Sequence, residues 1–200
     1  MNLSLITKSS DDYGRRVRGL AHGLWSGDIE PFSFVDGMVD LLFRNYEIAW
    51  QEGARQCGIL PADRSLEEAD RLRREVLADQ GRIMGYTDWI VVHSKALGFP
   101  YSTIVSRAEI WANRYNSIVT LAQVTACADK KMVWYYGMTE QHCNDCGSYE
   151  GKVYRASVWA KWGAIPRSHA LECGGWLCDC RLSLTDAPVT PGHPHSPTGG

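Results

Sequence analysis

The sequence predicts a mainly α-helical protein with a small α+β module toward its C-terminal end. Apolar residues recur at three- and four-residue steps through much of the first 127 residues, as on one face of a helix. Residues 132–182 instead alternate short aromatic runs with Gly, Asn and Asp, which is typical of small β-hairpins and loops. Six of the seven cysteines lie after residue 126. We therefore expect a helical body followed by a cysteine-rich module of hairpins and loops.

The first 30 residues predict one or two short helices, because Gly14, Gly19, Gly23 and Gly27 interrupt the pattern. From Ser33 a longer helix is expected, which Gly53 and Gly58 end. Pro31 and an acid in the first turn suit its start. Its apolar face consists of Val35, Met38, Val39, Leu42, Phe43 and Tyr46.

Ser65 and Glu68 form a capping-box pattern that begins the next predicted helix. This helix should reach about Leu97, with an interruption at Gly81 or Gly85. Its charges alternate in sign, which favours a solvated helix face over a nucleic-acid surface. A break at residues 98–100 precedes a further helix, from Ser102 to about Cys127.

Three regions are therefore predicted: a helical N-terminal body over 1–97, a helix plus a cysteine-rich metal-binding module over 98–186, and a flexible tail over 187–200. The tail holds four of the eight prolines, so it cannot form a core of its own. For the same reason His193 and His195 are not expected to hold a metal.

Composition and charge exclude several classes of protein. The 21 Lys+Arg against 23 Asp+Glu give a formal charge of −2, unlike a strongly basic nucleic-acid-binding protein or an acidic disordered chain. The densest apolar run, residues 89–92, is far shorter than the ~18 residues of a membrane span, so no membrane contact is expected. The N-terminus lacks signal-peptide features, so we expect a compartment where disulfides are rare. Cys57 and Cys127 should then be ordinary buried thiols on helices.

The strongest chemical signal is a set of five cysteines. A Cys-x-x-Cys turn can direct two thiolates at one ion, and a second cluster from another loop can complete a zinc tetrahedron. A loop-rich segment of this size also has little core, so a structural Zn²⁺ would substitute for missing burial. Disulfides and unpaired thiols remain alternatives. Four coordination positions are open to five candidate cysteines: Cys143, Cys146, Cys173, Cys178 and Cys180. The fourth ligand is undecided between Cys173 and Cys180. His142 and His169 are lesser candidates.

Catalytic interpretations of these cysteines have little support. A zinc deaminase needs His-x-Glu upstream of Pro-Cys-x-x-Cys, and the chain has no proline before Cys143. Thiol–disulfide exchange needs Cys-x-x-Cys at a helix start in a βαβ unit, which nothing upstream supplies. We therefore expect no enzyme and no catalytic residues.

A string of short motifs runs through residues 95–182 in a recognisable order: Ser106–Glu109, Trp111–Tyr115, Lys131–Trp134, His142–Cys146, Gly151–Val153 and Cys178–Leu182. In this order they resemble the C-terminal part of tailed-phage minor head, or head-morphogenesis, proteins of the Mu protein F-like group. Members of that group commonly close with His-Pro-x-Cys-x-Cys, and Cys173 could replace that histidine as a ligand.

The resemblance implies a structural protein of a tailed bacteriophage, made in the host cytoplasm and located in the virion. It would act in capsid assembly near the portal or inner capsid, with the portal and major capsid proteins as partners and several copies in each particle. Contact with packaged DNA is expected to be weak at most.

Arg107 and Glu109 belong to that motif string, but residues two apart on a helix point to different sides. Separate structural contacts are therefore expected for them. The tryptophans at 111, 134, 159, 162 and 176 are expected to pack around the metal module. The alternative function, a zinc-ribbon nucleic-acid-binding adaptor, would use them as a stacking platform beside Arg155, Lys161 and Arg167. A zinc-dependent enzyme is the remaining alternative.

Overall fold

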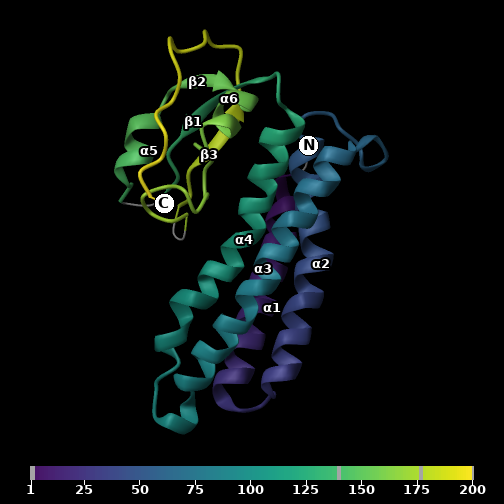
Figure 1. The fold of residues 1–200 in the computed structure, drawn as a ribbon, viewed down its shortest axis with the longest axis vertical. Helices are drawn as coiled ribbons and strands as arrows, with labels where there is room; N and C mark the ends of the chain where they lie inside the picture. Colours follow the sequence, from purple (N-terminus) through teal and green to yellow (C-terminus); the bar gives the residue numbers. More distant parts are fainter. Residues whose placement is uncertain (1–2, 139–140, 176–177, 200) are drawn as a thin grey trace. The chain divides into compact units, whose positions relative to one another are not determined.

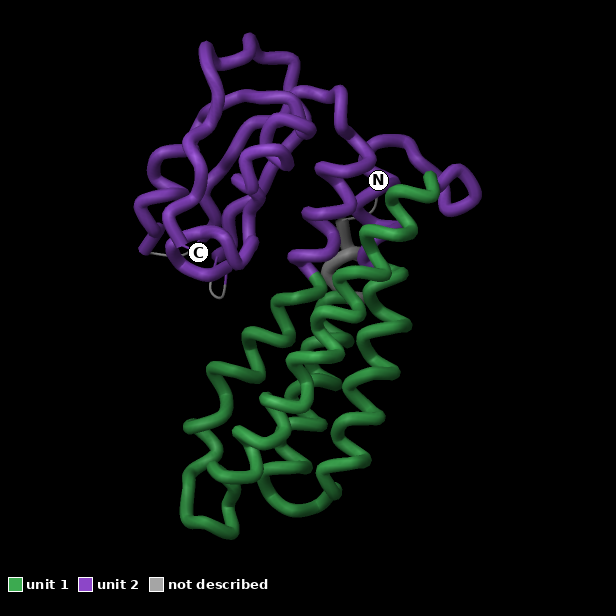
Figure 2. The backbone as a smooth tube through the Cα atoms, viewed as in Figure 1, with its two compact units in different colours: residues 1–48, 65–115 green, residues 49–64, 116–200 purple. Residues whose placement is uncertain are grey.

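The computed structural model describes residues 3–138, 141–175 and 178–199, and it is mainly helical with a small antiparallel sheet (Figure 1). Residues 1–48 and 65–115 form one compact unit, and residues 49–64 and 116–200 form the other (Figure 2). Helices α2 and α4 contribute to both units. The elements are α1 Leu3–Ser26, α2 Pro31–Arg55, η1 Pro61–Asp63, α3 Leu66–Val92, η2 Lys95–Leu97, α4 Ser102–Ala126, β1 Lys131–Tyr135, α5 Asn144–Tyr149, β2 Val153–Arg155, α6 Ala156–Lys161 and β3 Arg181–Leu184.

The first unit is a bundle of four helices whose core is rich in aromatic rings. Tyr13 of α1 lies 6.4 Å from Tyr46 of α2 and 5.8 Å from Tyr115 of α4, measured between ring centroids. Tyr86 of α3 stacks on Trp111 of α4 at 5.7 Å. These contacts connect all four helices through one buried core.

An ion pair is also buried in this bundle. Arg114 Nε donates to the Asp79 carboxylate at 2.8 Å, and the Tyr46 hydroxyl donates to the same carboxylate at 2.7 Å. Asp79 is 1% exposed and Arg114 is 8% exposed. Burial lowers the pKa of Arg114, but Tyr46 and Asp79 raise it above its ordinary value, so the guanidinium stays charged. Losing one partner would leave the other charge buried without compensation.

The capping box predicted at Ser65 is confirmed. Ser65 Oγ accepts from the Glu68 amide at 3.2 Å, and Glu68 accepts from the Ser65 amide at 3.0 Å. The predicted interruption at Gly81 or Gly85 is wrong, because α3 runs unbroken from Leu66 to Val92.

The expectation of short helices before residue 30 is also wrong, since α1 is continuous over Leu3–Ser26. At Gly14 a β-carbon would lie 3.3 Å from Ala112 Cβ, so this glycine permits a close helix contact. Helix α2 continues through Gly53 and ends at Arg55, between the two glycines expected to end it. A β-carbon at Gly53 would overlap the Val119 carbonyl oxygen of α4. Gly27, at φ +85°, follows the last residue of α1.

The second unit contains the sheet, with strand order β2-β1-β3 and both pairs antiparallel. In register, Met132 faces Tyr154 on one side and Leu184 on the other. Trp134 and Trp159 are fully buried in this unit. Their rings, with centroids 5.6 Å apart, form the core on which the sheet packs.

A disulfide joins Cys57 to Cys127 within the second unit, so the expectation of two ordinary buried thiols is wrong. Cys57 follows α2 and Cys127 follows α4, and their Cα atoms lie 5.3 Å apart. The glycine contact at Gly53 brings these two helix ends together, which places the sulfurs within bonding reach.

Among the described residues, none of the helices combines the length and the apolar character that a membrane crossing needs.

Candidate metal centre

The Cys-x-x-Cys turn is built by the start of α5. Cys143 occupies the N-cap position, and its sulfur accepts from the Cys146 amide at 3.5 Å. Cysteine replaces the usual Ser or Asp cap here, so the same contact that begins the helix turns Cys143 toward Cys146. The two sulfurs therefore lie on one side of a short, fixed turn.

All five predicted cysteines come together around this turn. The sulfurs of Cys143, Cys146 and Cys173 lie within 4.8 Å of one another, and so do those of Cys146, Cys178 and Cys180. Cys146 belongs to both groups. Its sulfur is 3.9 Å from that of Cys178, close to the ~3.8 Å between two sulfurs of a tetrahedral zinc site with Zn–S near 2.3 Å.

The thiols of this cluster influence one another's protonation. Hydrogen bonds from Cys146, Cys173 and Cys180 hold the pKa of Cys178 far below that of a free thiol. Hydrogen bonds with Cys173, Cys178 and Cys180 raise the pKa of Cys146. A metal ion that binds to such a group of thiols displaces their protons. The all-sulfur donor set fits a soft or borderline ion such as Zn²⁺.

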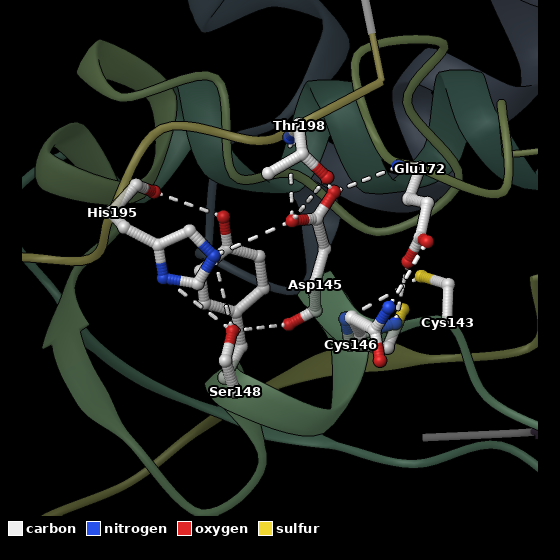
Figure 3. Close-up of polar contacts among 9 residues, drawn as sticks. Cys143, Asp145, Cys146, Ser148, Glu172, His195 and Thr198 are labelled. Carbon is white, nitrogen blue, oxygen red and sulfur yellow. Dashed lines mark hydrogen bonds and ion pairs between the residues drawn. The ribbon is translucent and has the colours of Figure 1, made fainter.

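A reciprocal pair of carboxylates connects two of the three loops that carry these thiols. Asp145 Oδ2 accepts from the Glu172 amide at 2.7 Å. In return, Glu172 accepts from the Asn144 amide at 2.7 Å and from the Asn144 side chain at 3.1 Å (Figure 3). The turn at 143–146 is thus held against the residue that precedes Cys173 by contacts that involve no metal.

Arg167 supports the third loop of the cluster. Its Nε donates to the Cys178 carbonyl at 3.0 Å, and its guanidinium pairs with Asp179 at 2.7 Å. Arg167 has φ +65°, and a β-carbon on Gly175 would overlap its carbonyl oxygen. This close backbone approach requires glycine at position 175.

The C-terminal tail, for which the composition predicts flexibility, makes hydrogen bonds with the module. Thr198 donates to Asp145 from its amide at 3.1 Å and from its hydroxyl at 3.2 Å (Figure 3). The Tyr149 hydroxyl donates to the His195 carbonyl at 2.9 Å, and the two rings stack at 4.6 Å. Asp145, which is 1% exposed, therefore joins the tail to the Cys-x-x-Cys turn and to the loop that carries Cys173.

Hydrogen bonding also explains the ionisation of Asp145. Burial raises its pKa, but hydrogen bonds from the Glu172 and Thr198 amides outweigh burial, and the pKa lies below its ordinary value. The sequence contains a signal for this residue that composition does not reveal: an acid inside the Cys-x-x-Cys turn, next to the first free amides of a helix.

The two histidines considered as lesser ligands lie outside both sulfur groups of the described residues. His142 stacks on Tyr136 at 3.9 Å, and its Nδ1 lies 4.0 Å from the Cys180 sulfur. It therefore borders the cluster. In the tail, His193 stacks on Trp162 at 4.0 Å, so its ring packs against an aromatic face.

Only some of the predicted tryptophans pack in this module. Trp134 and Trp159 form its core, and Trp162 lies against the tail. Trp111 belongs to the helical unit instead, where it stacks on α3. Trp176 lies outside the described residues.

The separate structural contacts expected for Arg107 and Glu109 are confirmed. The Arg107 guanidinium lies over the Trp89 ring, 4.1 Å from its centroid. Glu109 pairs with Arg18 at 3.0 Å. Each side chain thus holds a different helix of the bundle against α4.

Comparison of the chain with protein-family models, with curated proteins and with solved structures gives no match to any of them.

Proposed function

We propose that this chain is a structural assembly protein of a tailed-phage head, and that its C-terminal module is built around a structural zinc ion. The zinc part rests on one observation: five cysteines from three loops place their sulfurs in two groups that share Cys146. The assembly part rests on the ordered motif string that resembles minor head proteins.

A structural role for the ion is favoured over catalysis by the chemistry around it. A catalytic zinc needs an open coordination position and a general base beside it. Asp145, the carboxylate inside the turn, is buried and accepts hydrogen bonds from two backbone amides. Those hydrogen bonds favour a positioning role for this carboxylate rather than proton transfer.

Protein partners are favoured over nucleic acid by charge. The formal charge is −2, whereas nucleic-acid affinity depends on cations that neutralise phosphates. Two of the three basic residues suggested for such a surface already bind backbone carbonyls: Arg155 binds that of Asp129 at 2.6 Å, and Arg167 binds that of Cys178. The portal and the major capsid protein are the partners that we propose.

Elemental analysis of the purified chain tests the zinc part. Protein made without added metal should carry about one zinc per chain. Cys146→Ser should lose the ion and unfold the module, while the helical unit keeps its circular dichroism signal. The double variant Cys57→Ser/Cys127→Ser removes cysteines outside the cluster and should retain zinc.

The assembly role is read out separately, by incorporation into particles and by pull-down with purified portal and major capsid protein. Wild-type protein should incorporate, and Cys146→Ser should not. A zinc-free chain with Cys143 and Cys146 in a disulfide would contradict the metal proposal. A zinc-loaded chain that neither enters particles nor binds a head protein would contradict the assembly proposal.

A further inference from the structure

One exposed face of α3 combines apolar side chains with glycines. Leu77, Met84 and Val91 recur every seven residues and are 54%, 55% and 40% exposed. Seven residues make nearly two helical turns, so these side chains form one stripe along the helix. Large apolar side chains gathered on one exposed helix face indicate an interaction surface.

The centre of this face is flat. Gly81 and Gly85 are exposed, and a β-carbon built on either would meet nothing within 4 Å. Glycine inside a helix is destabilising relative to alanine, and no neighbour in the chain requires it at these positions. A second helix could approach the α3 backbone closely here, as small residues at helix contacts allow.

Charges on the same face specify how that second helix would lie. Arg74, which forms an exposed ion pair with Asp70 of the same helix, and Asp88 are each seven residues from Gly81, one before it and one after it. In an antiparallel pair of α3 helices that cross at Gly81, residues equally far before and after the crossing lie at the same height. Arg74 would then lie beside Asp88 of the second copy, and Asp88 beside its Arg74.

The apolar residues agree with the same crossing point. Leu77 and Met84 lie on one flank of Gly81, four residues before it and three residues after it. In the antiparallel pair each would contact the other residue of the second copy. Ala78 and Gly85, on the opposite flank, leave room for the backbones to approach.

We propose that this face, defined by Arg74, Leu77, Gly81, Met84 and Asp88, binds a second copy of the chain, with two α3 helices packed antiparallel about Gly81. The contact covers Leu77, Met84 and the open glycines, and it places Asp88 of the second copy beside Arg74 in addition to Asp70 of the same helix. It does not depend on the metal module or on the phage assignment. A single helix face is smaller than the roughly 800 Å² per partner of a standard interface, so the dimer should be weak and reversible.

Sedimentation velocity on the full chain, over the widest accessible concentration range, should show a monomer–dimer equilibrium. Arg74→Asp places the new carboxylate beside Asp88 of the second copy, at two points of the contact. Asp88→Arg places the new guanidinium beside Arg74 of the second copy in the same way. Each single variant should weaken dimerisation about tenfold or more, since like charges at a contact are repulsive. The double variant Arg74→Asp/Asp88→Arg should restore it.

Mixing the two single variants gives a sharper test of the antiparallel geometry. Each variant repels its own copies, because one carries an acid at both positions and the other carries an arginine at both. In the mixture every acidic position of the first meets a basic position of the second, so a heterodimer should form. Phe43→Glu, at a 54% exposed position on α2, is the matched control and should leave dimerisation unchanged. A wild-type chain that stays monomeric at every concentration, or a dimer indifferent to these charge reversals, would overturn the proposal.

Discussion

Asp145 shows how one side chain can organise a cysteine cluster through hydrogen bonds alone. Its carboxylate accepts from Glu172 in one ligand loop and from Thr198 in the tail, while its own backbone lies between two candidate ligands. Groups of this kind orient metal ligands and are nearly as important to affinity as the ligands themselves. The cluster is therefore expected to be largely arranged before an ion binds.

Replacing Asp145 by alanine should weaken zinc binding about 10- to 100-fold, because the Glu172 and Thr198 amides would lose their acceptor and the ligand loops would separate. Competition with a chromophoric chelator measures the dissociation constant. Asp186→Ala is the matched control, since the described contacts at Asp186 involve its backbone carbonyl. Equal zinc affinity in the Asp145 variant and the control would show that the carboxylate does not support the site.

At the scale of elements, the meaning of a glycine in a helix depends on what lies opposite it. At Gly53 a β-carbon would overlap the Val119 carbonyl and lie 2.8 Å from Ala122 Cβ, so α2 and α4 touch backbone to backbone. At Gly19 a β-carbon would meet nothing within 4 Å. The same residue type therefore permits a helix contact at one site and only loosens a helix at the other.

Gly53→Ala should accordingly lower the free energy of unfolding by about 1–3 kcal/mol, because the added methyl group forces the two helices apart. Gly19→Ala should leave it unchanged or raise it by up to about 1 kcal/mol, through better helix propensity. Urea denaturation followed by circular dichroism compares the two. Destabilisation of equal size in both variants would mean that helix propensity, and not the contact at Gly53, determines the effect.

This dependence on neighbours explains which elements the sequence predicts well. The capping box at Ser65 and the helix from Ser102 depend on residues three or four apart, so their signals are local. The Cys-x-x-Cys turn is local too, and its spacing identifies the site. Gly14 and Gly53 face residues about 100 and 66 positions away, which no local pattern contains.

At the scale of the whole chain, the features missed from the sequence are long-range contacts. The tail has too few apolar residues for a core, but it contacts the module more than 45 residues away: Asp145 accepts from the Thr198 amide, and the Tyr149 hydroxyl donates to the His195 carbonyl. The Cys57–Cys127 bond spans 70 residues and encloses α3 in a covalent loop. The chain therefore contains two distinct groups of cysteines, one bonded and one free.

That division predicts the response of the chain to reductant. Closing a 70-residue loop removes chain entropy from the unfolded state, which amounts to at most about 4 kcal/mol of stability at 25 °C. Reduction should lower the free energy of unfolding by up to this amount, and Cys57→Ser/Cys127→Ser should match the reduced wild type and ignore reductant. After chelation and unfolding, thiol titration should count five thiols before reduction and seven after it. Seven thiols without reductant would show that the two helix ends are held by packing at Gly53 alone, and the stability of the wild type would then be independent of redox conditions.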